Sequence, residues 1–297
     1  MMDFRHAKTP VRLLAAAAIA ALAAAAPASA QETIRFAVTD VDGLENLQRE
    51  FGPFVEAFEE KSGLEVAFFP VSGRTAAVEA MAADQVDFVL TGPAEYVVFN
   101  ARLGAEPVVG WQRPDYFAQI VVLADGPIKT AQDLEGTTIS FGEIGSTSQH
   151  LGPAQALADL GVMYGEDYEP IFVNRNVAVE ALKRGDIGAI GMNFTHLTRI
   201  REAFPETGFT VVARGRDLPN DILVASPNLD DALVERVRAT FLEHGAELMR
   251  AVVETTDDNR KYAGGVFLPQ IADADYDYVR QMYETIGIRE FLEFVGE

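Results

Sequence analysis

The stretch FGEIGSTSQHLGP, residues 141–153, joins the end of an apolar strand to the start of a helix through a glycine turn and three consecutive hydroxyl residues. The glycines allow a tight turn, and the first amides of the helix have no partner within it. The helix dipole adds positive potential where Ser146, Thr147 and Ser148 can donate hydrogen bonds. The stretch therefore predicts an anion-binding turn, and a simple helix cap is the alternative interpretation.

Short apolar strands and helices alternate on both sides of this turn. The first series comprises strands at residues 33–38, 64–70 and 86–91, joined by helices at 45–62 and 74–83. The second comprises strands at residues 138–141, 169–174 and 188–192, again joined by helices. Two such series with short connections predict an α/β fold with mostly parallel sheets covered on both faces. We expect a binding site in the crevice at the carboxyl ends of the strands.

The amino-terminal segment has the pattern of a secretory signal. Arg5, Lys8 and Arg12 form a basic region, residues 13–26 are an apolar, alanine-rich run, and a small-x-small pattern ends at Ala30. We therefore expect cleavage after Ala30 and export to the periplasm. The alternative, a membrane anchor, is less consistent with an apolar run shorter than the ~20 residues of a membrane span. Because the chain has no cysteine, lipid attachment through cysteine and disulfide bonds are both excluded.

The composition limits the possible partners. The chain carries 24 basic and 45 acidic residues, a formal net charge of −21. A field this negative repels nucleic acid and anionic lipid, so we expect neither a nucleic-acid partner nor direct membrane insertion. Any anion must then be captured by local dipoles and a few placed cations.

No familiar catalytic or metal-binding motif is found. The sequence lacks a Gly-x-Ser-x-Gly elbow, a His-Glu-x-x-His pair and a lysine after the glycine turn. None of its four histidines stands at zinc-ligand spacing from another. We expect a binding protein rather than an enzyme, with no cofactor and no metal.

Five short segments carry a resemblance to a known family. They are QVDF at 85–88, GPAEY at 92–96, DLEG at 133–136, FGEIGSTS at 141–148 and ALKRGD at 181–186. With them, the chain resembles the phosphate-, phosphite- and phosphonate-binding periplasmic receptors, which are type II solute-binding proteins of ABC importers. The resemblance extends over nearly all of the chain that follows the signal segment.

The resemblance implies a monomer with two lobes that close on a small oxyanion. Residues 31–116 and 216–297 would form lobe 1, and residues 117–215 would form lobe 2, each a mostly parallel sheet flanked by helices. The closed protein would deliver its ligand to an ABC permease in the inner membrane. A periplasmic sensor that signals to a membrane histidine kinase is the alternative, and the ligand itself stays open among phosphate, phosphite, phosphonates, arsenate, sulfate and carboxylates.

The resemblance and the local sequence together assign ligand contacts to Ser146, Thr147, Ser148, Tyr96, Arg74, Arg175 and Asp221. Arg74 and Arg175 stand where relatives that bind phosphonates carry an aromatic residue and a histidine, which implies a more cationic pocket. The alternatives from the residues alone are packing for Tyr96, a turn-holding role for Asp221 and a solvated loop cation for Arg175.

Overall fold

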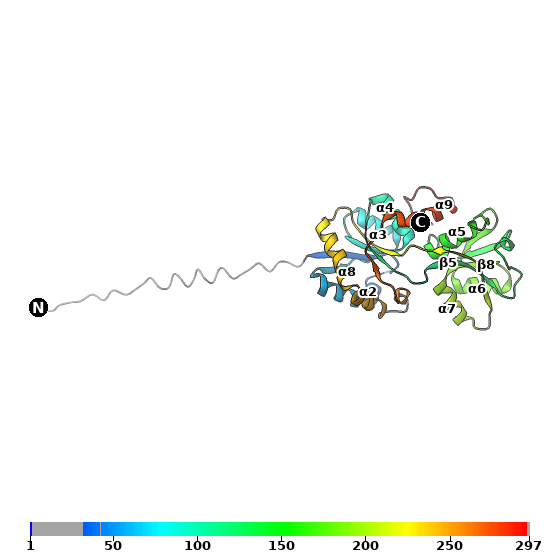
Figure 1. Ribbon diagram of the computed structural model, residues 1–297, viewed down its shortest axis with the longest axis horizontal. Helices are drawn as coiled ribbons and strands as arrows, with labels where there is room; N and C mark the ends of the chain where they lie inside the picture. Colours follow the sequence, from blue (N-terminus) through cyan, green and yellow to red (C-terminus); the bar gives the residue numbers. More distant parts are fainter. Residues whose placement is uncertain (2–31, 42, 296–297) are drawn as a thin grey trace. The chain divides into compact units, whose positions relative to one another are not determined.

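Two separate β-sheets organise the chain in the computed structural model, which describes residue 1, residues 32–41 and residues 43–295 (Figure 1). The predicted signal segment and its cleavage site after Ala30 lie outside the described residues. Residues from Thr33 onward form one compact unit. None of the helices among the described residues combines the length and the apolar character that a membrane span requires.

The first sheet has six strands in the order β11-β4-β10-β3-β1-β2. Their bounds are β1 (Thr33–Val38), β2 (Glu65–Phe68), β3 (Phe88–Thr91), β4 (Glu106–Trp111), β10 (Asp221–Ala225) and β11 (Phe267–Leu268). The second sheet has five strands in the order β7-β6-β8-β5-β9. Their bounds are β5 (Phe117–Leu123), β6 (Thr138–Phe141), β7 (Glu169–Phe172), β8 (Ala189–Asn193) and β9 (Phe209–Asp217).

Both sheets are mixed, which corrects the expectation of mostly parallel sheets. β1 pairs in parallel with β2 and β3, and β6 pairs in parallel with β7 and β8. In contrast, β10 runs antiparallel to β3 and β4, and β5 runs antiparallel to β8 and β9. The chain passes from the first sheet to the second between β4 and β5, and returns between β9 and β10. The predicted α/β class is nevertheless confirmed.

Helices cover both faces of each sheet. The bounds are α2 (Leu44–Ser62), α3 (Arg74–Ala82), α4 (Pro93–Leu103), α5 (Gly152–Ala158), α6 (Arg175–Arg184), α7 (Phe194–Ala203), α8 (Asp231–Val253) and α9 (Asp277–Thr285). α2 and α8 lie together on one face of the first sheet, and α3, α4 and α9 lie on the other (Figure 1). α5 covers one face of the second sheet, and α6 and α7 cover the opposite face. We call the first sheet with its helices the first lobe, and the second sheet with its helices the second lobe.

An aromatic cluster fills the core between the first sheet and helices α2 and α8. Trp111, the single tryptophan of the chain, is fully buried against Phe54, Phe241 and Phe267, with ring centroids 5.0–5.9 Å apart. Aromatic pairs at these separations add to the stability that buried apolar area already provides.

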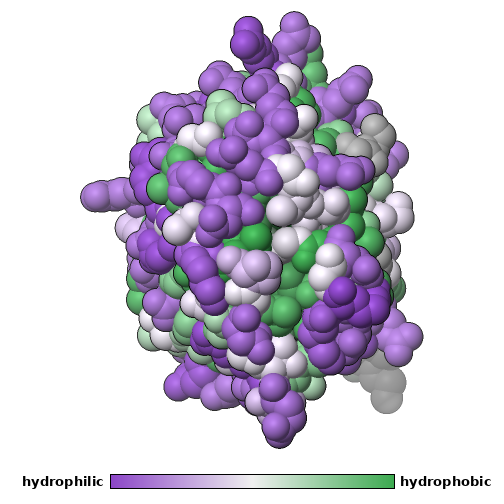
Figure 2. All heavy atoms as spheres, turned by 90° about the vertical axis from the view of Figure 1, so that its right-hand side faces the viewer, coloured by the Kyte–Doolittle hydropathy of each residue, from purple (hydrophilic) through white to green (hydrophobic). Residues whose placement is uncertain are grey.

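The outer face of the second lobe, seen in Figure 2, is mostly hydrophilic, with hydrophobic residues in small areas only.

Candidate functional site

A cavity of about 560 Å³ lies where the two lobes meet, at the carboxyl ends of several strands. The first lobe contributes Thr39 and Asp40 after β1, Thr91 at the end of β3, and Asp221 at the start of β10. The second lobe contributes the segment 146–149 after β6, and Asn193 at the end of β8. This is the location that the alternation of strands and helices predicted.

Several helices begin at this cleft. α3 starts just after Gly73, α4 just after Gly92, and α7 just after Asn193, and all three preceding residues line the cavity. A π-helical turn, Thr147–Leu151, begins after Ser146 and leads into α5. The positive dipole ends of these helices favour negative charge in the cavity.

The predicted anion-binding turn is held from within the second lobe by a buried histidine. The amide of Gly145, which has a left-handed φ of 76°, donates to Nδ1 of His150 at 3.1 Å. Nε2 of His150 lies 3.0 Å from the Tyr164 hydroxyl. Burial lowers the pKa of His150 to about 4, so its ring is neutral near pH 7 and Nδ1 is available as the acceptor. His150 therefore fixes the turn without adding charge.

The hydroxyls of the turn differ in how they are engaged. Thr147 Oγ1 accepts a hydrogen bond from the backbone amide of Ala94, in the first turn of α4, at 3.0 Å. Ser148 Oγ accepts one from Nδ2 of Asn193 at 3.0 Å. No side-chain hydrogen bond of Ser146 is found within the described part of the chain, so its hydroxyl is the one most available to a ligand.

Arg113, a largely buried cation of the cleft, is already neutralised. Nη1 of Arg113 lies 3.3 Å from Oδ1 of Asp221, and its guanidinium carbon lies 3.7 Å from the centre of the Tyr116 ring. Burial acts most strongly and lowers the pKa of Arg113, but the charge and hydrogen bond of Asp221, together with the neighbouring Tyr116 and Tyr262, outweigh it and raise that pKa overall. Asp221 also accepts from the Tyr262 hydroxyl at 2.7 Å, and Lys261 Nζ lies 3.9 Å from its Oδ2.

Arg74 is neutralised in the same way, by two glutamates. Its Nε lies 2.7 Å from Oε1 of Glu95, and its Nη2 lies 2.5 Å from Oε1 of Glu143. Burial raises the pKa of Glu95 to about 7, and the positive charge of Arg74 offsets part of that rise. Gly92 makes room for this carboxylate, because a Cβ there would stand 2.5 Å from Oε2 of Glu95.

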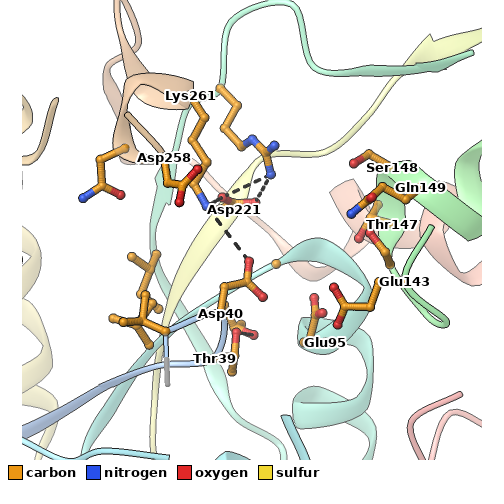
Figure 3. Close-up of a pocket in the computed structure, with 18 of the residues that line it drawn as sticks. Thr39, Asp40, Glu95, Glu143, Thr147, Ser148, Gln149, Asp221, Asp258 and Lys261 are labelled. Carbon is orange, nitrogen blue, oxygen red and sulfur yellow. Dashed lines mark hydrogen bonds and ion pairs between the residues drawn. The ribbon is translucent and has the colours of Figure 1, made fainter. Parts of the chain in front are cut away.

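Carboxylates outnumber cations among the side chains that line the cleft. The six carboxylates belong to Asp40, Glu50, Glu95, Glu143, Asp221 and Asp258, and the four cations belong to Arg74, Arg113, Arg199 and Lys261. Figure 3 shows the carboxylates of Asp40, Glu95, Glu143 and Asp221 around the cavity. The cations therefore do not leave the cleft with a net positive charge, because each of them is paired with a carboxylate.

The structure places five of the seven predicted contact residues along the cleft: Ser146, Thr147, Ser148, Arg74 and Asp221. Tyr96 lies elsewhere, fully buried, with its hydroxyl donating to Oδ1 of Asp273 at 2.9 Å and its ring 4.3 Å from that of Tyr276. Arg175 lines a neighbouring cavity of about 510 Å³ together with Asn174 and Asn176. A ligand contact for either residue stays a prediction.

Four cleft residues escaped the sequence interpretation. Asn193 directly follows a predicted strand and caps α7 by accepting from the amide of His196 at 2.9 Å, so strand-end reasoning could have found it. Burial, followed by nearby arginine charges, lowers the pKa of His196 to about 3, so it is a neutral donor or acceptor in the cleft. Arg113 stands in a connecting segment and Lys261 in a short 3-10 helix, Asn259–Tyr262, and no local pattern marks either residue.

The comparisons with known proteins identify the family. Residues 36–263 match the family described as ABC transporter, phosphonate, periplasmic substrate-binding protein. The chain belongs to this family. It is therefore a periplasmic substrate-binding protein of the ABC-transporter type and not an enzyme.

Individual relatives agree with this identification. The substrate-binding protein is 22% identical over 233 residues to the phosphonates-binding periplasmic protein of Escherichia coli, covering 74% of this chain and 69% of that protein. It is 29% identical over 176 residues to a putative aliphatic sulfonates-binding protein of the same organism, covering 57% of this chain and 53% of that protein. Its fold matches that of PhnD1 from Prochlorococcus marinus in complex with methylphosphonate, with a TM-score of 0.65, 15% identity, and coverage of 85% of this chain and 97% of that one.

Proposed function

We propose that this substrate-binding protein captures a small organic oxyanion, of the phosphonate or sulfonate type, between two closing lobes and delivers it to an ABC permease in the inner membrane. Lobe 1 would comprise residues 31–116 and 216–297, and lobe 2 residues 117–215. The protein would act as a monomer in the periplasm after cleavage at Ala30. The observation that carries the proposal is the turn at Ser146–Ser148, which faces the cleft beside the start of a helix.

The charges of the cleft narrow the ligand further. Six carboxylates and four cations line the cleft, and each of the cations is paired with a carboxylate. A second negative charge on the ligand would therefore gain little electrostatic stabilisation from the side chains. A ligand that also carries an ammonium group gains from the carboxylates of Asp40 and Asp221 while its oxyanion meets the helix starts. We therefore propose a zwitterion, such as an aminoalkyl phosphonate or sulfonate, rather than phosphate or sulfate. The neutralisation of Arg74 removes the reason to expect a purely anionic ligand.

Binding measurements on the purified, anion-free protein test this function. We expect 2-aminoethylphosphonate or taurine to bind at least about tenfold more tightly than methylphosphonate, methanesulfonate, phosphate or sulfate, corresponding to about 1.4 kcal/mol or more. Ser146→Ala should lower the affinity for every ligand that the natural protein binds. Ser140→Ala is the control, since Ser140 is a fully buried serine within β6, outside the cleft, whereas Ser146 is half-buried.

Each result has a clear meaning. Tighter binding of the ligands without an amino group would overturn the zwitterion proposal but retain the oxyanion. No binding of any phosphonate, sulfonate, phosphate or sulfate would overturn the oxyanion proposal itself. The sensor alternative has no support from these comparisons, because the family that matches is one of transporter components.

A further inference from the structure

The guanidinium of Arg74 spans the cleft from one lobe to the other. Arg74 begins α3 of the first lobe, and its Nε is held at 2.7 Å by Glu95 of the same lobe. From there, Nη2 reaches Oε1 of Glu143 at 2.5 Å, and Nη1 donates to the carbonyl oxygen of Ile144 at 3.0 Å, both in the second lobe. Its side chain is only 11% exposed, and its three nitrogens are all engaged by protein groups.

The second-lobe partners of Arg74 belong to the segment that leads into the anion-binding turn. Glu143 and Ile144 directly precede Gly145, and a Cβ on Gly145 would stand 3.2 Å from Nη1 of Arg74. The guanidinium therefore lies directly against the backbone of the turn. His150 holds the same backbone by accepting from the Gly145 amide. The turn is thus fixed by its own lobe through His150 and fixed to the opposite lobe through Arg74.

We propose that Arg74 is a positioning residue that locks the Glu143–Ser148 turn against the first lobe and sets ligand affinity by stabilising the closed cleft, without contacting the ligand. The proposal rests on the proposed function for its affinity part only. Because every contact of the lock joins two protein groups, the lock favours closure whether or not a ligand is bound. A ligand that binds only the closed form then has an apparent affinity that scales with the closed fraction.

The buried guanidinium of Arg74 distinguishes the lock from a second ion pair across the cleft. Arg199 and Asp258 also join the two lobes, at 3.2 Å, but their side chains are 40% and 74% exposed. Exposed pairs of this kind contribute little, since water screens them. Arg74 is only 11% exposed and is held by the buried Glu95, so its guanidinium is already desolvated and oriented before it meets Glu143, whose own side chain is 64% exposed.

Glu143→Gln is the most selective variant for a test. It removes the charge across the cleft, keeps the side-chain size and leaves the pair of Arg74 with Glu95 intact. Glu143 is 64% exposed, so the variant should fold. Glu180→Gln is the matched control, because Glu180 makes an equally simple ion pair with Lys183 at 3.1 Å on α6, outside the cleft.

The first measurement follows the lobes directly. The chain has no cysteine, so spin labels can be placed on Glu56→Cys in α2 and Glu202→Cys in α7, two exposed positions on different lobes. In anion-free buffer we expect one main short distance for the labelled protein and for Glu180→Gln. Glu143→Gln should add a population at longer distance. A distance distribution that is the same in all three proteins would overturn the lock.

The second measurement compares affinities for 2-aminoethylphosphonate, methylphosphonate and methanesulfonate. Loss of the lock lowers the closed fraction of the protein, and this fraction enters the affinity for every ligand in the same way. Glu143→Gln should therefore weaken the binding of each ligand by one common factor, roughly 5- to 20-fold. Glu180→Gln should leave the affinities unchanged. A loss confined to one ligand class would mean direct contact and overturn the positioning role. If none of the probes binds, the proposed function fails, while the distance measurement still decides whether the lock exists.

Discussion

Glu95 gives the sharpest test of the electrostatics of the cleft, because it is a buried carboxyl whose protonation should affect stability near neutral pH. It is 4% exposed, and burial raises its pKa from 4.5 to about 7, partly offset by Arg74. Between these two values the folded chain keeps a proton that the unfolded chain has lost. The free energy of unfolding contributed by this group therefore falls as pH rises from about 4.5 through about 7.

The size of the effect follows from the two pKa values. A difference of about 2.5 between them corresponds to about 3 kcal/mol. Glu95→Gln keeps the shape of the protonated side chain and cannot ionise, so it lacks this decline. We expect the stability of the natural protein relative to Glu95→Gln to fall by up to about 3 kcal/mol between pH 5 and pH 8.

Urea unfolding followed by tryptophan fluorescence measures this difference at each pH. Trp111 is the single tryptophan and is fully buried, so its emission reports loss of the first-lobe core. Glu79→Gln is the control, since Glu79 lies on α3 with its side chain 57% exposed in a pair with Arg102. Parallel pH curves for the natural protein and Glu95→Gln, or a relative gain of stability with rising pH, would refute the reasoning.

Two further predictions concern stability and use the same unfolding assay. Arg113→Met leaves the carboxylate of Asp221 without its buried partner and should lower the free energy of unfolding by about 3 kcal/mol. Adding Asp221→Asn to this variant should recover part of the loss. Equal stabilities of Arg113→Met and the natural protein would contradict the prediction. Gly145→Ala places a side chain on a left-handed backbone with φ 76° and should lower the free energy of unfolding by about 1–2 kcal/mol. Gly52→Ala, in helix α2 with no atom within 4 Å of the added Cβ, should not destabilise the protein. Similar effects of the two alanines would argue against strain at Gly145.

Local sequence patterns located the site well where they marked the ends of strands and the starts of helices. The turn at residues 146–148 was predicted to face a binding crevice because glycines, hydroxyls and a helix start stand together in the chain. The same reasoning applies to Asn193, which follows a strand and caps α7. In each case the deciding chemistry, unpaired amides and a capping side chain, lies within a few residues.

The roles of the long charged side chains did not follow from such patterns. Arg74 and Arg175 have similar local contexts, yet one is enclosed by two glutamates and the other lines a neighbouring cavity. Tyr96 stands close to the end of a strand but is packed against Tyr276, from a segment far along the chain. The direction of these side chains depends on which distant segment packs beside them.

The sequence by itself determined the class of fold, the family and the turn that faces the cleft, because periodicity, glycine placement and helix starts are properties of neighbouring residues. The tertiary structure alone decided that every cation along the cleft has a carboxylate partner and that Arg74 connects the two lobes. Those pairings join residues as much as 108 positions apart, as for Arg113 and Asp221. Charge neutralisation at such distances depends on how the sheets bring their loops together, and no local pattern carries that information.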